Sequence, residues 1–268
     1  MNDDAPPLPL AVRVIVPLVL GAIVLGLWQL AVWWFEVPKF VLPPPSAIGH
    51  ALVSDFGSLM TSLWITLRIT ILAFFIALAC GVALAVLSVQ SRMIEMSIFP
   101  YALILQVTPV VAIAPLILIW VGVDHIDRAL LILATIVAFF PILSNTTLGL
   151  KSVDHNLRDL FQLYGGTRWQ RLRLLQMPTA LPFLLSGMKI SGGLALIGAV
   201  VAEFVAGSGT GSGLAWRIIE SANRLNIPRM FAALLLLSAL GIVIFLLLAG
   251  LQDLLLRRWH ESAVRRER

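Results

Sequence analysis

The chain has 268 residues, of which 59% are hydrophobic and only 12% are charged, and its formal net charge is +5. A soluble domain carries about 25% charged residues, so this composition excludes an ordinary water-soluble protein and favours one covered by lipid. The single cysteine, Cys80, excludes an intrachain disulfide, and its place in an apolar segment favours a packing role.

Six apolar segments are each long enough to cross a bilayer, which takes roughly 20 residues of α-helix. Five contain no charged residue, and the fifth in chain order contains Lys189 and Glu203 near its ends. None shows the alternation that a membrane β-strand requires. The sequence therefore predicts an all-α integral membrane protein with about six transmembrane helices, at residues 14–34, 69–91, 96–123, 129–150, 183–206 and 230–252.

The stretches around the first span are polar or proline-rich. Residues 1–13 are predicted to be a cytoplasmic segment ahead of a retained helix, not part of a cleaved signal peptide. Prolines at 43–45 stiffen the chain, and Ser46 is the expected N-cap of the next helix. Apolar residues at helical spacing over 48–63 predict an amphipathic helix at the outer membrane interface. The alternative is that this stretch simply begins the second span.

Polar and helix-breaking residues lie inside the later spans. Pro109 and Pro115 are expected to bend the third span. Polar groups in lipid are costly and usually face the protein interior or a water path, which gives four candidates for a translocation path or gate: Gln106, Thr108, Asn145 and Glu203. We expect Glu203 to act as an outer-gate residue or as a structural ion pair with Arg68. Glycines at 192, 193 and 198 are expected to allow close helix packing.

The loop between the fourth and fifth spans, residues 151–182, is basic and rich in glycine and proline. Residues 157–164 are predicted to form a short helix, with Asp159 in the first turn where a negative charge suits the helix dipole. Gly165 and Gly166 are expected to end it, because glycine adopts left-handed backbone angles freely. Thr167 is the expected cap of a second short helix, after which Pro178 and Pro182 set the angle of entry into the membrane.

Basic residues are distributed unequally between the two sides of the predicted membrane domain, residues 14–256. With the N-terminus inside, twelve arginines and lysines fall on the cytoplasmic side and five on the other, and the tail at 257–268 is strongly basic. This asymmetry places both termini in the cytoplasm. The positive charge therefore indicates orientation and contact with membrane lipid rather than with nucleic acid.

No constellation of residues in the sequence predicts catalysis or a metal site. The glycine-rich stretch GSGTGSG at 207–213 lacks the lysine and the following hydroxyl residue of a phosphate-binding loop, so a flexible turn is the preferred interpretation. The four histidines lie in four separate loops, and no serine, histidine and acid arrangement is evident. A short surface helix is predicted over residues 214–225.

The loop at 151–182 resembles the EAA loop of binding-protein-dependent ABC importer permeases. That pattern is Glu-Ala-Ala, three residues, Gly, nine residues and Ile-x-Leu-Pro. The spacing of this pattern is intact in the chain, but Asp replaces Glu and Leu-Phe replaces Ala-Ala. A second glycine follows the first. The residues at the matching positions, with this glycine, are Asp159, Leu160, Phe161, Gly165, Gly166, Leu175, Met177 and Pro178. The phrases LPPPSAI, TPVVAIAPLILIW and GGLALIGAVVAEF are similar to the nitrate, sulfonate, taurine and thiamine-precursor branch.

This resemblance implies a type I ABC importer permease-like fold in a bacterial inner membrane. It implies that the loop is a coupling helix for a cytoplasmic ATPase dimer, which uses ATP and Mg, while this chain holds no cofactor. Further implied partners are a second permease, most simply an identical one, and a periplasmic or lipid-anchored solute-binding protein. The substrate is expected to be a small polar or anionic organic solute, with a tilt to a pyrimidine or thiamine precursor. A stand-alone secondary transporter or channel and an integral membrane enzyme are the alternatives.

Overall fold

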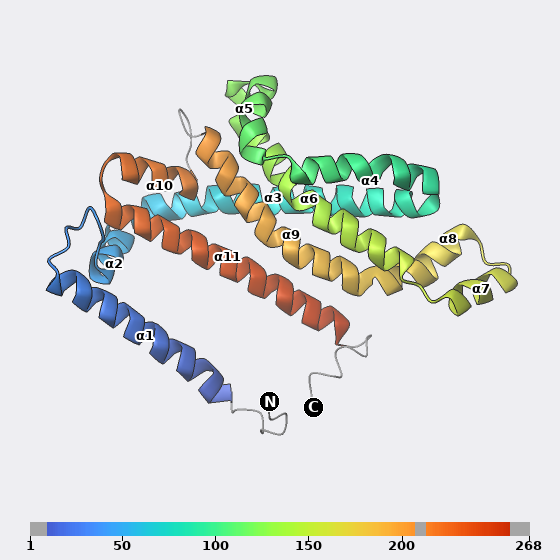
Figure 1. Cartoon of the computed structure of the whole chain (residues 1–268), viewed down its shortest axis with the longest axis horizontal. Coiled ribbons are helices and arrows are strands. Elements are labelled where there is room, and N and C mark those ends of the chain that lie inside the picture. The colour runs from blue at the N-terminus through green and yellow to red at the C-terminus, as the bar shows by residue number, and fades with distance from the viewer. Residues whose placement is uncertain (1–9, 207–212, 258–268) are drawn as a thin grey trace.

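The computed structural model of the chain describes residues 10–206 and 213–257 (Figure 1). All regular structure in these two ranges is helical. The elements in chain order are α1 (Leu10–Trp34), α2 (Pro45–Ser54), α3 (Phe56–Gln90), α4 (Arg92–Val107), α5 (Val110–Val121), η1 (Val123–His125), α6 (Ile126–Lys151), α7 (His155–Leu163), α8 (Arg168–Arg171), η2 (Leu172–Gln176), α9 (Met177–Ala206), α10 (Leu214–Asn223) and α11 (Ile227–Leu256).

Five helical segments in the described chain are long and apolar enough to span a membrane, and a bent pair makes a sixth. The five are the α1 segment from Ile15, α3, α6, the continuous run from α8 to α9, and α11. The expectation of an all-α membrane protein with about six spans is therefore confirmed. Three short helices, α2, α7 and α10, lie outside these spans.

The third predicted span is not one rod. It consists of α4 and α5, which meet at 102° across Thr108 and Pro109, and Figure 1 shows α5 turning sharply away from α4. Pro109 has no N–H to donate to the preceding turn, and a residue before proline is pushed to extended angles, as Thr108 is (φ −67°, ψ 125°). The predicted bend at Pro109 is confirmed, whereas Pro115 lies inside α5 without ending it.

The amphipathic stretch at 48–63 divides between two helices. The short helix α2 ends at Ser54, and the span-length helix α3 begins at Phe56, so the first part of the stretch is a separate helix and the rest begins the second span. The cap at the start of α2 is Pro44 with Pro45 in the first turn, which corrects the expected Ser46 cap. Proline suits the first helical position because the N–H it lacks would have no helical partner there. Ser46 instead donates its backbone N–H to Gln29 Oε1 at 3.2 Å.

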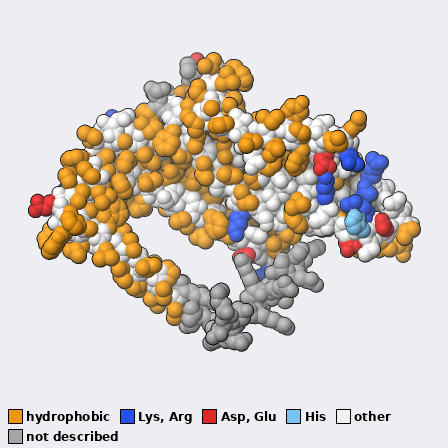
Figure 2. All heavy atoms as spheres, viewed as in Figure 1, with side chains coloured by type: hydrophobic (Ala, Val, Ile, Leu, Met, Phe, Trp, Pro, Cys, Tyr) orange, Lys and Arg blue, Asp and Glu red, His pale blue; other side chains and the backbone are white. Residues whose placement is uncertain are grey.

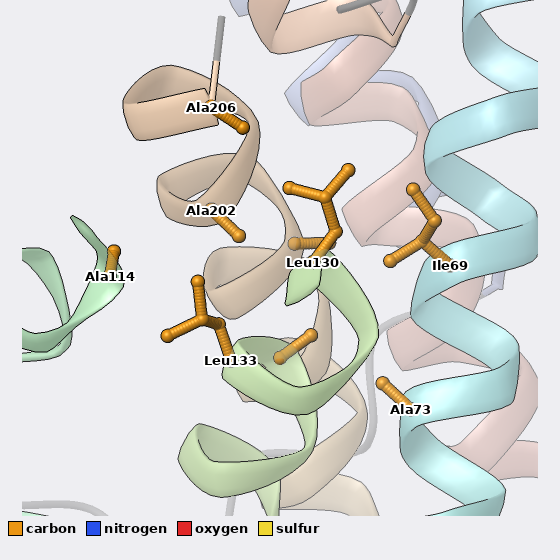
Figure 3. Close-up of a cluster of buried hydrophobic side chains, with 9 residues drawn as sticks. Ile69, Ala73, Ala114, Leu130, Leu133, Ala202 and Ala206 are labelled. Carbon is orange, nitrogen blue, oxygen red and sulfur yellow. The ribbon is translucent and has the colours of Figure 1, made fainter. Parts of the chain in front are cut away.

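Helices α3, α6 and α9 form the centre of the molecule, with α5 against one end (Figures 1 and 3). A Cβ at Gly198 would lie 2.8 Å from Ala134 Cα, and one at Gly187 would lie 2.9 Å from the Pro141 carbonyl oxygen, so α6 and α9 approach as only glycine allows. The cluster in Figure 3 is correspondingly built of small and branched side chains: Ile69, Ala73, Ala114, Leu130, Leu133, Ala134, Ala199, Ala202 and Ala206. The predicted role of Gly193 in packing is wrong within the described part of this chain, where nothing lies within 4 Å of a Cβ built at that position.

Large apolar side chains cover most of the visible surface outside this centre (Figure 2). In the most apolar window of α1 only 6% of residues are buried, and in that of α11 only 17%, compared with 44% for α6. A soluble protein would not expose such a surface, but in a bilayer lipid covers it. Helix α1 packs mainly near its end, where the Trp28 and Phe231 rings lie 6.1 Å apart.

Candidate functional site

The loop between α6 and α9 projects from one end of the molecule and carries α7 and α8 (Figure 1). Helix α7 begins at His155, and the Asp154 side chain caps it by accepting the Asn156 N–H at 2.7 Å. The predicted helix at 157–164 is therefore confirmed in kind but starts two residues earlier. Asp159 lies past the first turn, so the expected dipole role belongs to Asp154, which precedes the helix.

Two glycines end α7 as predicted. Gly165 has φ +68°, the left-handed conformation that residues with a Cβ rarely adopt. Its N–H donates to the Gln162 carbonyl at 3.1 Å, and the Gly166 N–H donates to the Phe161 carbonyl at 2.8 Å. These two bonds are the 5→2 and 6→1 pair of a Schellman motif, which satisfies carbonyls at the helix end. A Cβ at Gly166 would lie 2.8 Å from the same Phe161 oxygen, so Gly166 leaves no room for a side chain, whereas Gly165 is favoured by its positive φ alone.

Thr167 starts the return to the membrane with a capping box. Its Oγ1 accepts the Gln170 N–H at 3.2 Å, while Gln170 Oε1 accepts the Thr167 N–H at 2.8 Å. The predicted cap is confirmed, but the second helix is not a separate one. It continues through the π-helical turn η2 into α9, so one helical run extends from Arg168 to Ala206. The π-turn ends at Gln176, two residues before Pro178, and wide turns of this kind absorb a local break in helical bonding.

The return helix is anchored where it meets the end of α6. Leu172, Leu175 and Gln176 are buried, and Gln176 Nε2 donates to the Leu150 carbonyl at 3.3 Å. Met177 and Pro178 next to them are exposed. Of the residues matched to the EAA pattern, Leu175 therefore anchors the return helix by packing, whereas Met177 and Pro178 are accessible to a partner.

The outward part of the loop exposes apolar and charged groups together. No residue of α7 is buried, and Leu163 and Tyr164 are each 84% exposed. Leu160 and Trp169 add further exposed apolar area, and Asp159 is exposed beside them. Figure 2 shows basic side chains gathered at this end of the molecule. Exposed apolar area with a charged rim is typical of a protein-binding surface rather than of a lipid-facing one.

The four candidate path residues do not form one cluster. Asn145 on α6 lies beside Gly187 of α9. Gly187 is sixteen residues before Glu203, so the two positions are about 24 Å apart along α9. Asn145 Nδ2 donates to the Pro141 carbonyl at 2.8 Å, and Thr108 Oγ1 donates to the Ile104 carbonyl at 2.7 Å, so both bond to their own helices. Gln106 is exposed on α4.

Glu203 is the centre of a buried polar hub at the opposite end of α9 from the loop. It is 2% exposed, and its Oε1 accepts from Thr66 Oγ1 at 2.7 Å. Its Oε2 accepts the Ala215 N–H at 3.0 Å, while Thr66 Oγ1 accepts the Leu214 N–H at 2.9 Å. A carboxylate from α9 thus caps the N-terminus of α10, where a negative charge is favourable. These partners correct the expected pairing of Glu203 with Arg68, which is exposed on α3.

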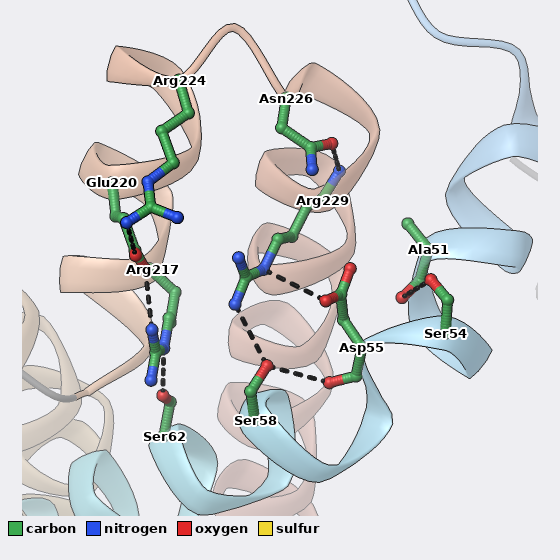
Figure 4. Close-up of polar contacts among 10 residues, drawn as sticks. All are labelled: Ala51, Ser54, Asp55, Ser58, Ser62, Arg217, Glu220, Arg224, Asn226 and Arg229. Atoms are coloured by element: carbon green, nitrogen blue, oxygen red, sulfur yellow. Dashed lines mark hydrogen bonds and ion pairs between the residues drawn. The ribbon is translucent and has the colours of Figure 1, made fainter.

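A network of arginines, drawn in Figure 4, secures the rest of α10 and the start of α11. Arg217 donates to Ser62 Oγ at 2.8 Å and to Glu220 at 2.7 Å, and Arg224 pairs with Glu220 at 3.1 Å. Arg229 donates to Ser58 Oγ at 3.1 Å and lies 3.8 Å from Asp55. The hydrogen bond from Arg217 holds the pKa of Glu220 below its ordinary value, against a smaller opposing effect of burial.

The sequence matches the family described as "Binding-protein-dependent transport system inner membrane component" over residues 77–261. The chain belongs to this family. The matched region contains the whole α6 to α9 loop, the polar hub except Thr66, and α10.

Relatives support the assignment along nearly the whole chain. The riboflavin transport system permease protein RibX of Chloroflexus aurantiacus is 34% identical over 244 residues, covering 90% of this chain and 88% of that protein. The formylaminopyrimidine transport permease protein ThiX of Halalkalibacterium halodurans is 30% identical, covering 86% and 90%. The putative aliphatic sulfonates transport permease protein SsuC of Bacillus subtilis is 29% identical, covering 91% and 87%.

A solved structure has a related fold. It is described as the crystal structure of an amino acid ABC transporter with histidines, and it superposes with a TM-score of 0.63 over 78% of this chain and 97% of that one, at 20% identity. The predicted resemblance to ABC importer permeases is confirmed. This permease is a transport subunit and not itself catalytic, and its family implies an ATPase and a binding protein as partners.

Proposed function

We propose that this permease couples ATP hydrolysis in a separate ATPase dimer to the import of a small organic solute across a bacterial inner membrane. Both termini and the loop at 151–182 face the cytoplasm, and α10 faces the side where a periplasmic or lipid-anchored binding protein delivers solute. Two permeases, most simply two copies of this chain, enclose the path. The basic asymmetry of the sequence supports this orientation.

The proposal rests on the structure of the loop that contains α7 and α8, which has a fixed turn and an exposed surface. The Schellman motif and the capping box fix its turn within a few residues. The exposed Asp159 and Leu160, the half-buried Phe161, and Gly165 and Gly166 together form a compact knob. Leu175 anchors the knob to a helix run that reaches Ala206 without interruption. If an ATPase displaces the knob, α9 would therefore move as one rigid helix. Met177 and Pro178 are the first residues of α9, next to the knob.

At the other end of that helix, Glu203 holds the N-terminus of α10. We infer that the polar hub latches α10 in one of two arrangements of the path and is released when α9 moves. Gln106 and Thr108 lie at the break between α4 and α5, and Asn145 lies beside α9, which makes each a candidate for contact with solute during the exchange. This scheme is alternating access driven by a two-state element.

The solute class that we propose is a nitrogen heterocycle of the pyrimidine type. The supporting observation is that RibX and ThiX, whose names specify riboflavin and formylaminopyrimidine, are 34% and 30% identical along most of the chain. A sulfonate is the alternative that SsuC supports, at 29% identity. Taurine and nitrate are further candidate solutes, because the sequence also resembles permeases of the nitrate, sulfonate and taurine branch. Binding of these compounds to the partnering solute-binding protein distinguishes them.

The test of coupling uses two glycines with positive φ. Gly165→Arg fills the knob and strains its turn, whereas Gly122→Arg places the same charge at Gly122, which has φ +89° and open space between α5 and η1. In vesicles reconstituted with the ATPase and binding protein, Gly165→Arg is expected to insert normally but to lose ATPase binding or solute-stimulated ATP hydrolysis. Gly122→Arg is expected to retain ATPase binding. Normal hydrolysis and uptake with Gly165→Arg would reject the coupling role.

A further inference from the structure

A cavity of about 800 Å³ lies between the first half of α4 and the end of α6, away from the knob and the polar hub. Three charged side chains line it, Arg92, Glu95 and Lys151, together with the apolar Met96, Phe99 and Leu103. Arg92 is the first residue of α4 and Lys151 is the last of α6. The charged part of the cavity therefore lies where both helices leave the membrane.

The charges in this cavity do not balance. Lys151 donates to Glu95, forming an ion pair that joins the first turn of α4 to the last turn of α6. Arg92 is exposed and has no hydrogen bond or ion pair within the described ranges of the chain. Two cations and one carboxylate leave one positive charge in excess, which a single monovalent anionic group would neutralise.

The apolar lining continues from the charged rim along one face of α4. Met96, Phe99 and Leu103 are spaced three and four residues apart, so they lie one above another over roughly 10 Å. Phe99 is held in place by an edge-on contact with Phe140, with ring centres 6.0 Å apart. Met96 and Leu103 are 67% and 51% exposed. A soluble anion would use only the rim, whereas an amphiphilic anion would use the rim and the apolar wall together.

We propose that this cavity binds an anionic phospholipid. Its phosphodiester contacts Arg92 and Lys151, and an acyl chain lies along Met96, Phe99 and Leu103. Basic pockets between membrane helices recognise anionic headgroups in this way. The lipid would hold α4 against α6 immediately before the loop that contains α7. The identity of the site does not depend on the proposed coupling, and the proposed orientation decides only which leaflet supplies the lipid.

The test compares two arginine variants of the purified full chain in detergent. Bound lipid is counted by native mass spectrometry while dioleoylphosphatidylglycerol or dioleoylphosphatidylcholine is added. Arg92→Gln removes a guanidinium that has no partner in the described chain, so folding is expected to be unaffected. Arg128→Gln, at the exposed first turn of α6, removes the same charge at the other end of that helix. Lys151→Gln provides a second change within the site.

The wild-type chain is expected to retain phosphatidylglycerol at a concentration about tenfold lower than phosphatidylcholine. Arg92→Gln and Lys151→Gln should abolish most of this preference, and Arg128→Gln should preserve it. Equal retention of the two lipids by the wild-type chain would overturn the proposal. So would an unchanged preference in Arg92→Gln, or displacement of the lipid by inorganic phosphate at the same concentration as phosphatidylglycerol.

Discussion

The two ends of the α9 run are built in opposite ways. At the loop end, α7 has no buried residue, and its shape is fixed by bonds between residues at most five apart, such as Gly166 to Phe161. At the hub end, Glu203 is 2% exposed and bonds to Thr66, which is 137 residues away in the sequence. A partner must reach the first region, so its polar groups are satisfied locally. The second region has to hold three helices together, so its polar groups are satisfied across them.

Substitutions at the two ends are therefore expected to have different consequences. A change in the hub leaves buried groups without partners and should lower the stability of the chain itself. A change in the loop alters a surface that the rest of the chain does not need for folding, so it should affect the partner and leave stability nearly constant.

Removing the hub carboxylate is expected to have the largest effect on stability. Glu203→Ala leaves the Thr66 hydroxyl and the Ala215 N–H without an acceptor, at a cost on the order of 1–3 kcal/mol for each. The measurement is the temperature at which half of the detergent-purified chain is no longer monodisperse. Asp159→Ala, which removes an exposed carboxylate from α7, is the control and should leave that temperature nearly unchanged. Equal losses in the two variants would contradict the contrast between the two ends.

Glu203→Gln is expected to have a smaller effect because it keeps the shape and one acceptor. The amide nitrogen cannot accept, so one of the two donors loses its partner, at about 1–3 kcal/mol. We expect the complex to assemble and solute uptake per assembled complex to fall, because the latch on α10 is weakened. The measurement is uptake in vesicles normalised to the amount of complex, with the exposed Glu36→Gln as control. Wild-type uptake per complex would show that Glu203 is a structural tie and not part of a gate.

The turn after α7 offers a comparison at one position. Gly165→Val must adopt φ near +68° with a branched side chain, at roughly 1–2 kcal/mol or more, whereas Gly165→Asn tolerates that conformation better. Solute-stimulated ATP hydrolysis is expected to fall several-fold with valine and to remain near the wild-type rate with asparagine. Thermal stability should be nearly equal in both, because the exposed turn can unwind locally to relieve the strain without disturbing the packed helices. If asparagine is as harmful as valine, the surface at 165 matters rather than its backbone angle.

The smallest expected effect concerns pH and the arginine network. Because the pKa of Glu220 is held below its ordinary value of 4.5, the ionised carboxylate stabilises the folded chain above that value. This contribution is lost as pH falls through the lowered pKa and Arg217 and Arg224 lose their anionic partner. The thermal stability of the wild type should therefore exceed that of Glu220→Gln at neutral pH and approach it in acid. A difference that is independent of pH would contradict this assignment.

Features that depend on neighbouring residues were accessible to prediction from the sequence. Gly165 and Thr167 act on bonds within a few positions, so the end of α7 and the start of α8 could be predicted, although the first residue of α7 was misplaced by two. Pro109 likewise marks the bend between α4 and α5. The continuity of α8 with α9 was missed, because a π-turn before Pro178 keeps the helix going where proline suggests a boundary.

The amino-acid sequence alone predicts a helical membrane protein with about six spans and a basic loop whose glycines and proline have the family spacing. Hydrophobicity over about 20 residues and turn chemistry over five are local properties, so they need no tertiary contact. The contacts of Glu203 with Thr66 and α10, in place of Arg68, become visible only in the folded chain. The same is true of the cavity that Arg92, Lys151 and Phe99 surround. A buried polar group bonds to whichever partner the packing of distant helices brings within about 3 Å, and sequence spacing does not reveal that partner.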